Sequence, residues 1–179
     1  MQLFPEDNGA EFSPDRKYRY ALWRIWDKTL PLVMFIGVNP SKANEDETDN
    51  TISVVKGYAK RWGYGGLYMM NLFAIVSTNP DVLKSDPDPL GDNDGWLERV
   101  APKCKKVIFA WGNFKQARER AKVVIQMFPN AEALYINKNG TPHHPLYLPA
   151  DIVPVKFDSD KRFQELERKA AKAGFYEKL

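Results

Sequence analysis

The apolar run at residues 32–38, "LVMFIGV", constrains the fold of this chain more than any other segment. The run is short, contains no polar residue, and is followed at once by Asn39 and Pro40. Such a run is typical of a strand that is buried on both faces, as in a parallel sheet covered by helices on either side. A chain that contains it must therefore supply helices to two faces of one sheet.

Helix-like and strand-like segments alternate after this run. Residues 51–62 repeat apolar positions at helical spacing and stop before Gly63, and residues 66–75 form a second apolar run. A long proline-rich and acidic loop follows at 77–94. The remaining segments are a short helix at 94–105, a strand at 106–112, a helix at 113–128 and a strand at 132–137. The alternation predicts an α/β fold, namely a three-layer α/β/α sandwich with a central four-stranded parallel sheet.

Length and composition favour a single soluble domain. The chain has 179 residues, of which 44% are hydrophobic and 27% are charged, which argues against disorder and against a membrane protein. We expect one domain over 1–179, with a core at about 18–157 and a packed C-terminal helix at 158–174. The acidic, proline-containing N-terminus does not resemble a signal peptide, which predicts a cytoplasmic protein. We expect a monomer.

The chain offers little to hold a cofactor. Its only histidines are the adjacent His143 and His144, and its one cysteine is Cys104, which makes a poor set of zinc ligands. The segment "GVNPS" lacks the glycines and lysine of nucleotide-binding loops, and no G-x-S-x-G motif of a serine hydrolase occurs. We therefore expect no metal and no cofactor.

Polar residues stand where each predicted strand ends. Asn39 follows the first strand and Asn71 lies in the second. Gly112 ends the third strand, Asn113 follows it, and His144 lies in the loop after the fourth. Taken singly, such residues are more often structural, because asparagine and glycine tolerate turns. Since ligands bind at the carboxyl ends of parallel strands, the combination predicts one cleft at this edge of the sheet.

The four strand ends, read in order, resemble the uracil-DNA glycosylase superfamily. The segments that carry the resemblance are "FIGVNPS", "GLYMMNLFAI", "VIFAWGNFKQ" and "HHPLYLP". The first is similar to the G-x-N-P form found in mismatch-specific thymine and uracil glycosylases. The chain also resembles a bacterial and phage family of unknown function that is marked by "NPS", "DNT", "NLFA" and "WG".

The resemblance implies a role for each residue at the strand ends. Asn39 would hold the attacking water and His144 would donate a hydrogen bond to the leaving base. We also consider Asp49 as a catalytic carboxylate, with capping of the helix near Thr51 as its structural alternative. The residues expected at the base are Gly37, Val38, Pro40, Asn71 and Phe73, and those expected at DNA are Ser41, Lys42, Gly112, Asn113, Leu146 and Leu148.

Two positions depart from the superfamily pattern. Leu146 stands where a phosphate-contacting serine is expected, and Asn39 replaces the aspartate of the stronger enzymes. Leu148 falls on the position of the wedge leucine, which enters the base stack. Because a carboxamide cannot accept the proton of water at neutral pH, a slow reaction is expected.

Three functions are compatible with these residues. The first is a DNA glycosylase that hydrolyses the N-glycosidic bond of a modified, damaged or mismatched base, with DNA, single-stranded or carrying modified bases, as its partner. The second is a catalytically inactive module of the same fold that binds a base or a nucleic acid. The third is an enzyme that acts on free nucleosides or nucleotides.

The basic residues Arg118, Arg120 and Lys122 are expected to form a solvated helix face.

Overall fold

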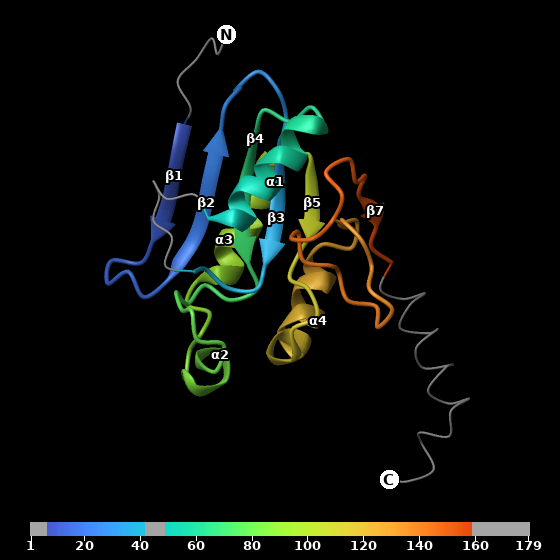
Figure 1. Ribbon diagram of the computed structural model, residues 1–179. Helices are drawn as coiled ribbons and strands as arrows, with labels where there is room; N and C mark the ends of the chain where they lie inside the picture. The colour runs from blue at the N-terminus through green and yellow to red at the C-terminus, as the bar shows by residue number, and fades with distance from the viewer. Residues whose placement is uncertain (1–6, 42–48, 159–179) are drawn as a thin grey trace, which may run out of the picture.

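The computed structural model describes residues 7–41 and 49–158 (Figure 1). Lys42 and residues 159–174 of the expected C-terminal helix therefore lie outside the described residues. The strands are β1 (Asp7–Phe12), β2 (Arg19–Ile25), β3 (Leu32–Gly37), β4 (Gly66–Asn71), β5 (Lys106–Phe109), β6 (Glu132–Ala133) and β7 (Val155–Lys156). The helices are α1 (Asn50–Arg61), α2 (Val82–Ser85), α3 (Asn93–Val100) and α4 (Arg118–Met127), with 3-10 turns η1 (Ala101–Lys103) and η2 (Lys115–Ala117).

The strands form one mixed sheet in the order β1-β2-β4-β3-β5-β6-β7. The prediction of an α/β fold is confirmed, but the prediction of a central sheet of four parallel strands is wrong, because the sheet formed by the described residues is mixed and has seven strands. The neighbours β4, β3, β5 and β6 pair in parallel. Antiparallel strands extend this part at both edges, β1 and β2 at one and β7 at the other.

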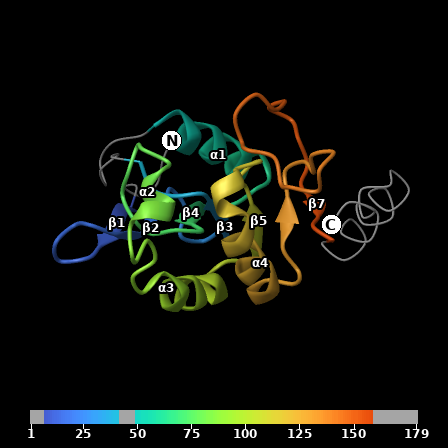
Figure 2. The ribbon, with the colours of Figure 1, turned by 90° about the horizontal axis from the view of Figure 1, so that it is seen from below.

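Strand β3 lies in the middle of the sheet and is buried on both faces. Val33 and Phe35 pack with α1 on one face, whereas Met34 and Ile36 pack with α3 and α4 on the other. All four side chains are fully buried. Viewed along the sheet, α1 lies on one side of the strands and α3 on the other (Figure 2). No helix of the described residues is long and apolar enough to cross a membrane.

The parallel strands end level with one another, which brings their loops to one edge. Gly37 of β3 pairs with Asn71 of β4, and the Phe73 amide beyond β4 donates to the Val38 carbonyl at 2.9 Å. On the other side of β3, the Ala110 amide donates to the Ile36 carbonyl at 2.8 Å. The segments that follow β3, β4 and β5 thus begin side by side.

Arg120 is not part of a solvated helix face, and this expectation is wrong. Its side chain is buried and its Nε donates to the Leu72 carbonyl at 2.8 Å. Its two terminal nitrogens contact the carboxylate of Asp94 in α3, so the guanidinium joins α3, α4 and the end of β4. By contrast, Arg118 and Lys122 are exposed, as predicted.

Replacing Arg120 by glutamine is expected to lower the free energy of unfolding by about 2 kcal/mol, because buried hydrogen bonds of a charged group are lost. Arg118→Gln, two residues away on the same helix and exposed, is the matched control and should change it by less than about 0.5 kcal/mol. Urea denaturation followed by circular dichroism measures both values. Equal stabilities of the two variants would contradict the role assigned to Arg120.

Candidate functional site at the carboxyl ends of the parallel strands

Asn71 ends β4 beside Gly37 and is only 3% exposed. A Cβ placed on Gly37 would lie 2.9 Å from the Asn71 Oδ1, so a larger residue at this position would displace the amide. The Asn71 side chain forms no hydrogen bond within residues 7–41 and 49–158, although its backbone carbonyl accepts one from Asn93 at 2.9 Å. Buried amides normally have partners, so an amide in this position suits a bound ligand or water.

Asn39 has a fixed amide orientation just beyond β3. Its Nδ2 donates to the Ser77 carbonyl at 2.8 Å and to the Pro40 carbonyl at 3.2 Å. Because both partners are hydrogen-bond acceptors, the amide atom that faces them must be the nitrogen. The Oδ1 of Asn39 is then an acceptor that no other described residue uses. An acceptor of this kind can orient a water molecule but cannot remove its proton.

Asp49 caps α1, which confirms the structural alternative for this residue. Its Oδ1 accepts a hydrogen bond from the Ile52 amide at 2.8 Å, and the Ser41 hydroxyl donates to Oδ2 at 3.2 Å. The charge of Asp49 also acts on two groups at this edge, because it opposes the lowering of the pKa of both Arg19 and His144 by burial. The carboxylate therefore lies within electrostatic reach of the histidine loop.

Arg19 at the start of β2 is a buried cation that the sequence did not reveal. It is 4% exposed, and its backbone amide donates to the Ala74 carbonyl beyond β4 at 2.9 Å. Burial lowers the pKa of Arg19 to about 10, and the charge of Asp49 opposes this shift. The guanidinium is therefore charged at neutral pH.

His144 packs directly on Gly112, the residue after Trp111. A Cβ on Gly112 would lie 3.3 Å from the Cβ of His144, and the φ of Gly112 is +74°, so both space and backbone conformation favour glycine here. The Leu146 amide donates to Nδ1 of His144 at 3.2 Å. Since Nδ1 accepts, the proton of the neutral ring is on Nε2, which is left as a donor.

The environment of His144 favours the neutral ring. Burial lowers its pKa below the ordinary value of 6.5, and the neighbouring His143 lowers it further, whereas Asp49 opposes the shift. Burial is the largest of these effects, because a charged ring would lose hydration. At neutral pH the site therefore presents an uncharged N–H donor.

His143 shapes the loop and does not share the position of His144. Its Nδ1 donates to the His144 carbonyl at 2.6 Å, and its ring lies edge-on to Tyr135 at 6.0 Å between centroids. Helix α1 holds the next part of the loop, because the Tyr58 hydroxyl donates to the Pro145 carbonyl at 3.2 Å. The position of the histidine loop is thus fixed by contacts of His143 on one side and by helix α1 on the other.

The remaining predicted site residues have mixed surroundings. Phe73 is 6% exposed and packs in the core on the α3 side. Leu148 packs against the core on the α1 side, and Val38 and Leu146 are half-buried. Asn113 is exposed and lines, together with Gly112 and His144, an open hollow of about 500 Å³.

The structure therefore gathers the predicted residues into two groups. Gly37, Asn39 and Asn71 lie together where β3 and β4 end, and Gly112, Asn113 and His144 lie together beyond β5. Asp49 acts on His144 of the second group electrostatically. Among the described residues, no three histidine, cysteine, aspartate or glutamate side chains are gathered as metal ligands would be.

Tyr147 is a second residue that the sequence did not single out. It lies between the two leucines of the histidine loop, is 99% exposed, and has a φ of 68°. Residues with a side chain rarely adopt this left-handed conformation. The ring of Tyr147 is therefore accessible to a molecule that binds at the histidine loop.

The lowered pKa of His144 predicts a pH-dependent stability. As the pH falls through 6.5 the unfolded chain binds more protons than the folded chain, so the free energy of unfolding decreases. From about pH 7.5 to about pH 5.5 the wild type should lose stability that a His144→Gln variant does not lose. Denaturation at both pH values measures the difference.

Proton NMR of a His143→Asn variant, which retains one histidine, gives the titration of His144 directly. The asparagine amide can replace Nδ1 of His143 as the donor to the His144 carbonyl. A His144 pKa at or above 6.5 would contradict the assigned environment.

Comparison with known proteins identifies one family. The family described as "Protein of unknown function (DUF1643)" matches residues 19–146, which include both groups of site residues. No curated protein and no solved structure shows significant similarity to the chain.

Proposed function

Because the chain belongs to the DUF1643 family of unknown function, membership supplies no activity, and we propose from the site itself that the protein is a DNA glycosylase. It would hydrolyse the N-glycosidic bond of a modified, damaged or mismatched base in DNA. The resemblance of the strand ends to the uracil-DNA glycosylase superfamily motivates this class of reaction. A glycosylase-like arrangement of the fold is part of the same proposal.

The observation that carries the proposal is the neutral N–H donor of His144. When a base leaves its sugar, negative charge develops on the base, and a preorganised donor stabilises that charge in the transition state. The hydrogen bond from the Leu146 amide to Nδ1 fixes the ring with its proton on Nε2. Packing on Gly112 restricts the position of the same ring.

The group at β3 and β4 would hold the base and the water. The Asn71 amide offers one donor and one acceptor at the edge of a base, and within the described part of the chain neither is already used. The Oδ1 of Asn39 would orient the water that attacks the sugar. Extraction of the base from a duplex costs a few kcal/mol, so single-stranded or mispaired substrates should react faster.

The test is excision of a base from synthetic oligonucleotides that carry uracil, mismatched thymine, or hydroxymethylated or glucosylated bases, followed by alkaline strand cleavage. His144→Ala should lower kcat about 10²–10³-fold, as for removal of a preorganised donor. His143→Asn is the matched control and should retain activity within a few-fold. No cleavage of any substrate, under conditions where a known glycosylase works, would contradict the proposal.

A second function, a catalytically inactive module that binds the same base, is favoured by the state of Asp49. Its carboxylate oxygens already accept hydrogen bonds from the Ile52 amide and the Ser41 hydroxyl. Together with the amide of Asn39, this leaves no identified general base for water. Binding of modified DNA without product over hours, and weaker binding by Asn71→Ala, would identify the module.

Tyr147 gives a prediction that concerns DNA binding under either function. An exposed aromatic ring can stack on a base of the bound strand, which is worth about 1–3 kcal/mol per base. Tyr147→Asn should weaken oligonucleotide binding at least about fivefold, whereas Tyr147→Phe should retain it. Fluorescence anisotropy measures both affinities.

The stability of the same variants separates a contact with DNA from a structural role. Asparagine tolerates a positive φ better than tyrosine, so Tyr147→Asn should unfold at the same or a higher denaturant concentration. Unchanged DNA affinity, or a clear loss of stability, would contradict the role of Tyr147.

A further inference from the structure

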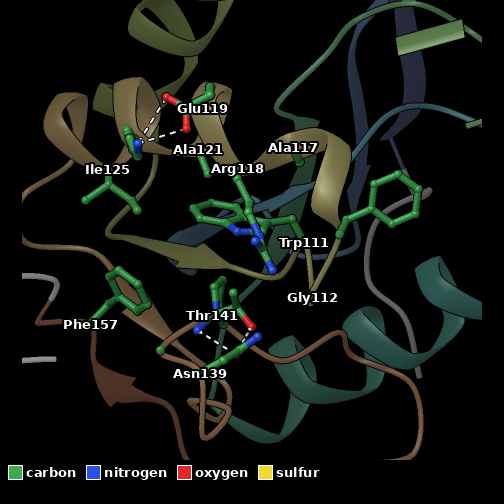
Figure 3. Close-up of a pocket in the computed structure, with 14 residues that line it drawn as sticks. Trp111, Gly112, Ala117, Arg118, Glu119, Ala121, Ile125, Asn139, Thr141 and Phe157 are labelled. Carbon is green, nitrogen blue, oxygen red and sulfur yellow. Dashed lines mark hydrogen bonds and ion pairs between the residues drawn. The ribbon is translucent and has the colours of Figure 1, made fainter. Parts of the chain in front are cut away.

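A second pocket lies between α4 and the loop that precedes the histidines (Figure 3). Its volume is about 400 Å³, within the range of about 300–1,000 Å³ that small-molecule sites occupy. Most of its lining is apolar, and the larger side chains are Trp111, Phe114, Ile125 and Phe157. Walls of this kind favour a flat, apolar part of a ligand.

One cation of the pocket has no partner among the described residues. Arg118 lines the pocket and, within the described part of the chain, forms no ion pair or hydrogen bond. Lys122, on the same wall, is instead paired with Glu119 at 2.8 Å. Figure 3 shows Arg118 reaching from α4 toward Asn139 and Thr141 on the opposite side. The guanidinium is thus available to an anionic group of a ligand that lies on the aromatic walls.

The pocket adjoins the hollow at His144. Gly112 and Asn139 line both, so a ligand in one is a neighbour of a ligand in the other. Asn139 also accepts a hydrogen bond from the Thr141 hydroxyl at 2.8 Å, which fixes the turn between the two spaces. A flat ring with an anion at one end, placed next to a base-binding site, has the chemistry of a nucleotide.

We propose that this pocket binds a nucleotide, with its base against Trp111 and Phe114 and its phosphate on Arg118. The inference rests on the proposed function for its choice of ligand, because a strand that brings one base to His144 brings the next nucleotide alongside. The same chemistry can also come from a free mononucleotide, and the experiment separates the two sources.

The experiment measures the binding of three ligands to the full chain. The binding of a single-stranded oligodeoxyadenylate is followed by the fluorescence of a label on it, and the binding of deoxyadenosine monophosphate and of deoxyadenosine is measured by calorimetry. Arg118→Gln removes the cation, and Ile125→Trp fills the pocket. Lys115→Gln, an exposed cation on η2 that does not line the pocket, is the matched control. His144→Ala is included because it removes the proposed catalytic donor and leaves this pocket intact.

We expect Ile125→Trp to weaken oligonucleotide binding at least about fivefold and Arg118→Gln to lower the salt dependence by about one unit of slope. Lys115→Gln should not reproduce the loss seen with Ile125→Trp. The His144→Ala protein should show the same losses on each pocket substitution, even where base excision is absent, so the two proposals fail separately. Binding of the monophosphate alone, with the same dependence on Arg118, supports the pocket with a free nucleotide as its ligand.

Two results would overturn the inference. One is that the full chain binds neither the oligonucleotide nor the monophosphate. The other is binding that Arg118→Gln and Ile125→Trp leave unchanged. Because Arg118 is exposed, its substitution tests the pocket even where Ile125→Trp fails to fold.

Discussion

The burial of β3 on both faces is the constraint on which the rest of the structure depends. Its side chains alternate between the α1 layer and the layer of α3 and α4, so both layers must be present for the strand to leave water. Parallel pairing with β4 and β5 then sets Gly37 level with Asn71 and brings the chain beyond β5 to the same edge. The candidate site is a consequence of this register, since its residues come from segments that follow different strands.

The parts of the fold predicted from the sequence are those with a strong local signal. The unbroken apolar run of β3 and the helical spacing of α1 identify their elements without tertiary information. Strands β1 and β2 carry no such signal, because β1 is only partly buried and β2 contains two buried arginines. Strand β7 has only two residues and is defined by its pairing with β6, which no local pattern encodes.

The site was predictable to the extent that it depends on strand ends. The packing of His144 on Gly112 joins residues far apart in the chain, and a histidine before a proline gives only an indication of it. Arg120 and Tyr147 show why the rest could not be predicted. The helical spacing of Arg120 predicts a surface position, but its side chain is buried and contacts Asp94 of α3. Tyr147 stands between two leucines in the sequence, but it is exposed and has a left-handed backbone. Both outcomes depend on neighbours that the sequence does not place.

The proposed reaction separates charge within the substrate, so the charged groups at this edge of the sheet bear on it. Arg19 is a buried cation with a pKa of about 10, and both the Asp49 carboxylate and the Arg24 guanidinium act on it electrostatically. Cleavage of a base from its sugar forms a positive and a negative fragment together. Under the proposed function, a neutral donor at His144 would stabilise the departing base without repelling the sugar cation that forms beside it.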